Sequence, residues 1–278
     1  MPNFRMLYDN VADVATLVVT SAASASLGAA NLKTDTKSQV WRAGGTSGAV
    51  TATWATAQLV NGVILPFTNL SPTATMQVRC YTNAADTTPV YDSGAVLACP
   101  AVPLALMSWG TVPLGANSYS YGGGTTARVW LNTTVSCKRV EVGFYDINNT
   151  SPYVEIGRLV IGSFWEGAKN VDYGATVTPV ETGKHFRNDA GDLMTDIGTR
   201  HRRVTISLSK LSPAERNTLW RILWGNGMTK PLFFSLYPND TDTSLEQTNQ
   251  CWCKLVTMPA MSTPSFLMYA AALELEEI

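Results

Sequence analysis

The chain has 278 residues, of which 45% are hydrophobic and only 15% are charged, and its formal net charge is −1. This length and hydrophobic fraction exclude a disordered chain and suit two domains, while the near-zero charge gives no reason to expect nucleic-acid sequence recognition. No apolar run reaches the roughly 20 residues that a membrane-spanning helix needs, so we expect no membrane insertion. The N-terminus lacks the features of a signal peptide, and we therefore expect a protein that is not secreted.

Residues 1–24 form a lead-in that is polar and mixed at its start. From about residue 25 to residue 165 the chain consists of short segments that alternate apolar and polar residues, as at 76–81 and 139–145. Clusters of glycine separate them, as at 122–124. Many short strands with this punctuation predict an antiparallel jelly-roll β-sandwich over residues 25–165.

Residues 166–200 are polar, glycine-rich and weakly periodic. This composition predicts a linker between two domains, with room for one hairpin. The basic run Arg200–Arg203 follows. It has two interpretations, a solvated turn or a contact with an acidic partner chain, and charge runs more often belong to the first kind.

Residues 201–278 contain the clearest helix signal of the chain. Ser212 is a good N-cap, Pro213 stands at the first helical position, and Glu215 completes a capping box. Apolar residues at helical spacing continue to residue 223, and Gly225 supplies a stop, which together predict a helix over 212–224. Strands are expected on both sides of it, so the fold class is mainly β, with an N-terminal jelly roll and a C-terminal β-sandwich that carries one packed helix.

The sequence contains few candidates for catalytic or metal-binding residues. It contains no nucleophile elbow, phosphate loop, zinc-protease motif or dinucleotide fingerprint, and we predict a non-enzymatic protein with no catalytic residue, no metal site and no cofactor. Asp240 and Asp242 could supply oxygen ligands to calcium, but the EF-hand spacing is absent and Asp is a common loop residue. The five cysteines are odd in number and irregularly spaced, which favours core packing over a disulfide framework.

Aromatic residues flank the glycine-rich turns. Aromatic faces cover the C–H surface of sugars, and a guanidinium group donates to hydroxyls. The candidate carbohydrate-binding residues are therefore Trp41, Arg42, Tyr119 and Tyr121. Each aromatic residue among them also suits a place in the core or in loop support.

Several motifs occur in an order that resembles a known family. Asn31-Leu32 and Trp41-Arg42 open the segment, Met76–Tyr81 follows, and Ile156-Gly157-Arg158-Leu159 closes it. In this order they resemble the discoidin or galactose-binding-like jelly rolls. The resemblance covers about residues 25–165 and implies either binding of sugars or lipid headgroups through loops, or a spacer role.

The C-terminal segment resembles a second family. Its strand, its capped helix, its Pro-Leu-Phe-Phe strand at 231–234 and its closing strand are similar to the ring-forming domain of bacteriophage tail-tube and distal-tail proteins. This resemblance implies a structural virion component of a tail tip or baseplate, assembled in the host cytoplasm. Its partners would be further copies, other tail or baseplate proteins and a host-surface glycan.

The final strand suggests how copies would associate. Alternation along 268–275 places Met268, Ala270, Ala272 and Glu274 on one face. If this strand lay at a sheet edge, its unpaired backbone groups would be a template for another chain. We therefore expect a homo-oligomeric ring with these four residues at its interface.

Two other functions remain open. A free-standing carbohydrate-binding module or lectin would carry the same jelly roll but would stay monomeric or form small oligomers. A glycan-degrading tail enzyme would show closely spaced acids on strands, which the sequence does not display.

Overall fold

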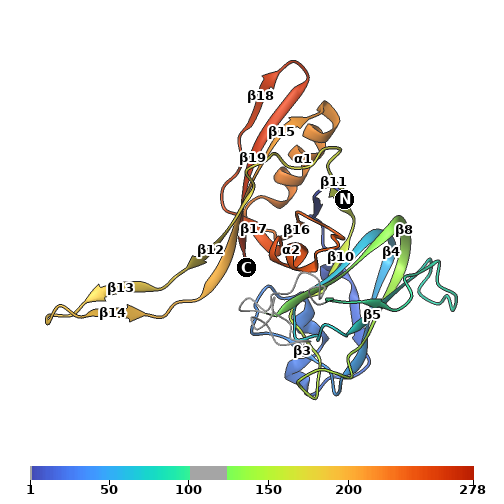
Figure 1. The fold of residues 1–278 in the computed structure, drawn as a ribbon. Coiled ribbons are helices and arrows are strands. Elements are labelled where there is room, and N and C mark those ends of the chain that lie inside the picture. The colour runs from blue at the N-terminus through green and yellow to red at the C-terminus, as the bar shows by residue number, and fades with distance from the viewer. Residues whose placement is uncertain (1, 101–123) are drawn as a thin grey trace. The chain divides into compact units, whose positions relative to one another are not determined.

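The structure is a computed structural model that describes residues 2–100 and 124–278 (Figure 1). It divides into two compact units. Unit 1 comprises Met1–Ala168 and Leu232–Trp252, and unit 2 comprises Lys169–Pro231 and Cys253–Ile278. The mainly β fold class is confirmed.

Unit 1 contains the predicted sandwich. Two long antiparallel strands, β4 (Ser47–Thr68) and β8 (Thr125–Tyr145), run through it and pair along most of their lengths. Register shifts after Thr53, Val60 and Leu65 interrupt this ladder. The shorter strands of the same sheet system are β2 (Thr16–Val19), β3 (Trp41–Arg42), β5 (Thr75–Tyr81), β6 (Tyr91–Asp92), β7 (Val96–Leu97), β9 (Glu155–Ile156) and β10 (Val160–Gly162).

The N-terminal residues are built into unit 1, which corrects the prediction of a separate lead-in over 1–24. Strand β1 (Arg5–Leu7) lies between β11 (Phe164–Glu166) and β16 (Leu232–Ser235) in an antiparallel sheet. Strand β2 pairs with β4. Short 3-10 helices lie at Val11–Val14, Ala25–Leu27 and Ala29–Lys33.

Residues 232–252 also belong to unit 1, which corrects the prediction of one continuous C-terminal domain over 201–278. The backbone pairing of β16 with β1 explains this, and so does an ion pair of Arg128 with Glu246. The predicted loop around Asp240 and Asp242 contains a helix, α2 (Thr243–Thr248). Asp242 is its N-cap and accepts from the backbone N–H of Ser244 at 2.9 Å, so this carboxylate is used locally.

Unit 2 is a sheet with one helix. Its strands are β12 (Thr176–Glu181), β15 (Arg200–Leu211), β18 (Met261–Ser265), β19 (Met268–Glu277) and the last residues of β17 (Gln250–Leu255). The helix α1 (Pro213–Asn226) packs on β15 and β19 through Leu219, Ile222 and Leu223. The predicted capping box at Ser212 and Glu215 is confirmed. The helix passes through Gly225 and ends at Gly227, whose φ of 55° only glycine adopts readily.

Strand β19 is not a sheet edge, which corrects the premise of the predicted interface. On one side β15 pairs with it from Tyr269 to Glu276. On the other side β18 and β17 pair with its first and last residues. The predicted alternation is present, because Ala271, Leu273 and Leu275 are buried while Ala272 is exposed. The final strand is central because its apolar face completes the core of unit 2.

The predicted linker over 166–200 is largely a β-hairpin. Strand β12 pairs with the start of β15, and beyond it β13 (Lys184–Arg187) and β14 (Leu193–Asp196) pair only with each other among the described residues. We call residues 182–198 the arm. Figure 1 shows the arm projecting from the sheet of unit 2 as a two-stranded ribbon.

The basic run Arg200–Arg203 is the first part of β15 and not a free turn. His201 and Arg203 pair with Glu276 at 3.0 and 2.7 Å, and Arg202 pairs with Glu277 at 2.6 Å. Arg200 pairs with Glu181 of β12 at 3.0 Å, so the acidic partners of this run lie within the same chain.

No helix in the described ranges 2–100 and 124–278 has the length and hydropathy to cross a membrane.

Candidate functional site

Among the predicted carbohydrate-binding residues that the structure describes, Trp41 and Arg42 do not share a surface. Trp41 is buried, and its indole N–H donates to the carbonyl of Ser21 at 2.9 Å. Its ring therefore has no face available to a ligand, since it packs in the sandwich core. Arg42 points the other way and pairs with Glu155, with its guanidinium 4.1 Å from the ring centroid of Tyr153. Tyr119 and Tyr121 lie outside the described residues.

A groove of about 360 Å³ lies on the outer face of the same sheet. It crosses the start of β4, the end of β8 and the start of β5, where Tyr145 is paired with both Ser47 and Thr75. Gly143 lies two positions before Tyr145 on β8, and Gln77 lies two positions after Thr75 on β5. These two residues are paired with each other, so they form the neighbouring row on the same face. The groove is therefore fixed by a regular three-stranded ladder, and its lining residues are Ser47, Gly48, Thr75, Met76, Gln77, Ala95, Gly143, Phe144 and Tyr145.

Glycine makes the floor of the groove. A Cβ placed on Gly143 would meet no heavy atom within 4 Å, so the space above this residue is open. A Cβ on Gly48 would lie 3.1 Å from the ring of Phe144, which supports the floor from the inside. Because glycine in a strand leaves no side chain on the sheet surface, a ligand can approach the backbone here.

Tyr145 forms the wall at one end of the groove, and 53% of its surface is exposed. Ser47 and Thr75 stand in register with it on the two neighbouring strands. Successive residues of a strand point to opposite faces, so these three side chains share the outer face. One aromatic ring and two hydroxyl groups therefore meet along a single row.

Gln77 provides the amide of the groove and is held in place by charged neighbours. Its Nε2 donates to Asp92 Oδ1 at 2.8 Å, and its Oε1 accepts from Arg79 Nη2 at 2.9 Å. The hydrogen bond from Gln77, with further bonds from Gly94 and Arg79, holds the pKa of Asp92 below its ordinary value. The carboxylate therefore stays ionised and fixes which way the amide faces.

The lining of this groove is uncharged. None of its nine lining residues carries a carboxylate, imidazole, ammonium or thiol group. Its hydroxyl groups, on Ser47, Thr75 and Tyr145, have no ionisable neighbour among the lining residues that could activate them as nucleophiles. Stacking and neutral hydrogen bonds are what the groove can offer.

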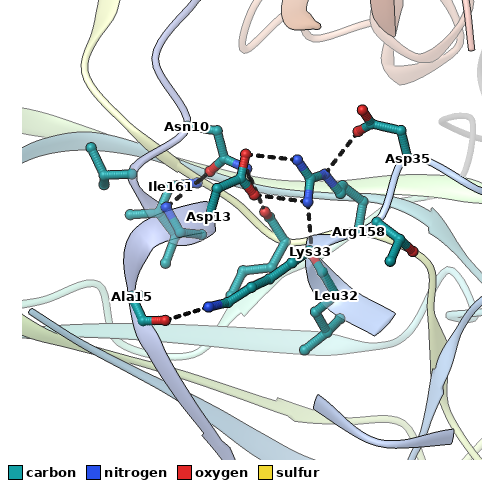
Figure 2. A network of polar contacts seen from close by, with 12 residues as sticks. Asn10, Asp13, Ala15, Leu32, Lys33, Asp35, Arg158 and Ile161 are labelled. Atoms are coloured by element: carbon teal, nitrogen blue, oxygen red, sulfur yellow. Dashed lines mark hydrogen bonds and ion pairs between the residues drawn. The ribbon is translucent and has the colours of Figure 1, made fainter. Parts of the chain in front are cut away.

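The motif residue Arg158 lies in a different network, which Figure 2 shows. Its guanidinium is buried, pairs with Asp13 at 2.8 Å and Asp35 at 3.3 Å, and donates to the carbonyl of Leu32 at 3.3 Å. Burial raises the pKa of Asp13, although Arg158 opposes this. The network ties the N-terminal residues and the 3-10 helices to the last strands of the sandwich, so the arginine of the predicted motif holds the fold together.

Other candidates in the sequence have structural places. All five cysteines are free thiols with buried side chains. Within residues 2–100 and 124–278, no group of three or more His, Cys, Asp or Glu residues is arranged to hold a metal ion. The predicted interface residues Met268, Ala270, Ala272 and Glu274 share the more exposed face of β19.

Sequence analysis missed Gly143, Tyr145 and Gln77 as a group. The signal was present in Arg139–Tyr145, where alternation places Tyr145 on the same face as Gly143. The sequence does not show that Tyr145 pairs with Ser47 and with Thr75, because these residues lie 98 and 70 positions before Tyr145 in the chain.

Comparison with known proteins identifies no family for this chain. No family model matches it, and no curated protein matches it. Solved structures of carbohydrate-binding modules are similar to part of it. A chitosan-binding module of a chitosanase/glucanase from Paenibacillus sp. IK-5 is 14% identical, covering 56% of this chain and 99% of the module, with a TM-score of 0.36.

A family 32 carbohydrate-binding module from Clostridium perfringens is 17% identical, covering 57% of this chain and 100% of the module, with a TM-score of 0.35. A fucosidase from Ruminococcus gnavus is 10% identical, covering 56% of this chain and 26% of the enzyme, with a TM-score of 0.38. TM-scores of this size carry no argument about function, so the function has to be argued from the groove itself.

Proposed function

We propose that unit 1 is a non-catalytic carbohydrate-binding module and that the groove over Gly143 is its binding site. The observation that carries this proposal is the exposed ring of Tyr145 beside a bare glycine floor. A sugar ring lying on that floor would place its C–H face against the tyrosine ring and its hydroxyls toward Ser47, Thr75 and Gln77. Such a combination of one aromatic face with a few placed polar groups is how small-ligand sites gain orientation and specificity.

The ligand class follows from the lining. No lining residue carries a formal charge, and the charged neighbours of Gln77, Arg79 and Asp92, are engaged with each other and with Gln77. The lining therefore desolvates no charge when a neutral saccharide binds, and it offers no cation to pair with an acidic one. We expect neutral glycans to bind more tightly than glycans with sialic or uronic acids.

A glycan array with the full-length protein, followed by calorimetry with the best neutral ligand, tests the proposal. Tyr145→Ala should weaken binding by at least about tenfold, because it removes the aromatic face. Gly143→Val should abolish binding while leaving unit 1 folded, because its side chain enters open space and suits a strand.

Tyr173→Ala is the matched control, because Tyr173 is a fully exposed tyrosine of unit 2 and does not line the groove. Equal affinity of the wild type, Tyr145→Ala and Gly143→Val for every glycan bound would contradict the proposal. So would the absence of any glycan signal with the wild type.

A second candidate function is that of a self-assembling structural protein, and the arm favours it. Phe186, Leu193, Met194 and Ile197 are exposed on a hairpin whose two strands pair only with each other among the described residues. An isolated two-stranded hairpin is at best marginally stable in water, and exposed apolar surface commonly marks a site of association. Mass measurement under native conditions distinguishes an assembling protein from a monomeric lectin.

The finer proposal is the one implied by the family resemblance, a homo-oligomeric ring in a bacteriophage tail tip or baseplate. It stays a proposal, together with its partners among other tail proteins and its place in the virion. Locating the protein in intact particles by electron microscopy would test it. A protein absent from purified particles would exclude this setting without affecting the glycan proposal.

A further inference from the structure

Helix α1 of unit 2 presents an aromatic face that its own unit leaves exposed. Arg216, Trp220 and Trp224 follow one another at intervals of four residues, which places them in a stripe along one side of the helix. The two indole rings are stacked, with centroids 6.2 Å apart and planes at 20°. Of their surfaces, 46% and 79% respectively are exposed. Leu219, Ile222 and Leu223 fill the core, and Arg216 lies 5.7 Å from the ring centroid of Tyr269, so the two tryptophans are the part of the stripe that stays largely exposed.

The arm carries a complementary apolar pair. Phe186 is paired directly with Met194 across the hairpin, and both side chains therefore lie on the same face. Both are exposed. A flexible thioether beside an aromatic ring suits contact with a flat indole surface.

The charges of the two elements are of opposite sign. The arm has three acids, Asp189, Asp192 and Asp196, against two bases, Lys184 and Arg187. Residues 210–230 around the helix have four bases, Lys210, Arg216, Arg221 and Lys230, against the single acid Glu215. Glu215 is held in the capping box by Ser212, at the first turn of the helix. Opposite charge around an apolar contact favours correct orientation and faster association.

In the structure the arm of one molecule does not lie on its own helix. It leaves the sheet at the Arg200 end of β15, whereas α1 begins after Leu211, at the other end of this 12-residue strand. At about 3.3 Å per residue these ends are about 35 Å apart. Figure 1 shows the arm continuing away from the sheet and from α1.

We infer that the arm of one copy docks on the tryptophan stripe of α1 in a second copy, with Phe186 and Met194 against Trp220 and Trp224. The contact joins two different surfaces, so each copy has one arm to donate and one helix face to receive. Such a head-to-tail contact closes into a ring or extends into a filament. This inference rests on the proposed self-association and is independent of the glycan-binding proposal.

Complementation between two full-length variants tests the inference. In the first variant Phe186→Ser and Met194→Ser disable the arm, and in the second Trp220→Ser and Trp224→Ser disable the helix face. All four residues are largely exposed, so both variants should stay folded, which circular dichroism and thermal denaturation check. Each variant alone should associate at least about thirtyfold more weakly than the wild type, because a central apolar anchor is lost.

An equimolar mixture of the two variants is expected to form a one-to-one dimer and nothing larger, measured by native mass spectrometry or analytical ultracentrifugation. One intact arm and one intact helix face remain in the mixture, which allows a single contact. Phe266→Ser is the control, because Phe266 is another exposed aromatic residue of unit 2, in the turn between β18 and β19. It should leave the assembly unchanged.

Three results would overturn the inference. A wild type that stays monomeric would overturn it together with the proposed self-association. A wild type that associates while the helix-face variant associates equally well would overturn the inference alone. Two variants that each fail to associate and also fail to dimerise on mixing would show that the arm and the helix face do not meet.

Discussion

The ring of Trp41 packs edge-on against the ring of Phe144, with centroids 5.3 Å apart and planes at 68°. Phe144 lies beneath Gly48 in the floor of the groove, and a Cβ on Gly48 would also approach Trp41 within 3.4 Å. Trp41 therefore supports the proposed binding site from inside the sandwich and does not contact a ligand.

Trp41→Ala should lower the free energy of unfolding of unit 1 by about 3–5 kcal/mol, because it empties a large buried volume. Urea denaturation followed by tryptophan fluorescence or circular dichroism measures this loss. Trp41→Phe should cost less, since part of the ring contact with Phe144 remains. If Trp41→Ala left stability unchanged but removed glycan binding, Trp41 would be a ligand platform after all.

Arg158→Ala should destabilise unit 1 by about 2–3 kcal/mol. The change leaves Asp13 and Asp35 without their shared cation, and removing one partner of a buried ion pair typically costs 3–5 kcal/mol. The lower figure allows for the partial exposure of the two carboxylates, 42% for Asp13 and 33% for Asp35. Arg42→Ala is the control in a half-exposed pair, and a loss as large as that of Arg158→Ala would contradict this account.

Ser212→Ala should lower the stability of unit 2 by about 1 kcal/mol, because the backbone N–H of Glu215 loses its acceptor at the start of α1. Ser212→Asp should retain most of the stability, since aspartate is an equally good N-cap. Thermal denaturation of the three proteins is the measurement. Identical melting temperatures for Ser212→Ala and the wild type would show that the cap contributes nothing.

At low concentration, where the protein is not assembled, trypsin should cut first within the arm. The expected sites follow Lys184 and Arg187, whose side chains are exposed. If the arm docks on a second copy, the same bonds should be cut more slowly at concentrations where the protein is assembled. Mass spectrometry of the early fragments gives the sites and rates. First cleavage inside β4 or β8 would contradict the described fold of unit 1.

Glycan affinity should be constant from about pH 5 to about pH 8, because no residue lining the groove titrates in that interval. Asp92, which orients Gln77, has a pKa lowered from its ordinary value of 3.8. Its hold on the amide is therefore complete above that value and is lost only as the pH falls through the lowered pKa. Calorimetry across this range tests the expectation, and a drop in affinity near pH 6 would implicate a group outside the groove.

The local signals of the sequence determined the mainly β fold and the start of α1. Alternation fixed which face of Met268–Glu277 is buried, and Ser212, Pro213 and Glu215 fixed the first turn of the helix. These features depend on neighbours within a few positions, whose preferences the sequence displays directly. The end of the helix was predicted at Gly225, whereas the structure carries it to Asn226 and caps it with Gly227.

Only the tertiary structure decided which segments meet. The central place of β19, the membership of Leu232–Trp252 in unit 1 and the burial of Trp41 all follow from pairings between residues far apart in the chain. The groove has the same origin, since Ser47, Thr75 and Tyr145 share one row only through the register of three strands. Alternation tells which residues of a strand share a face, but it does not tell which strand lies beside it, because backbone hydrogen bonds are the same for every partner.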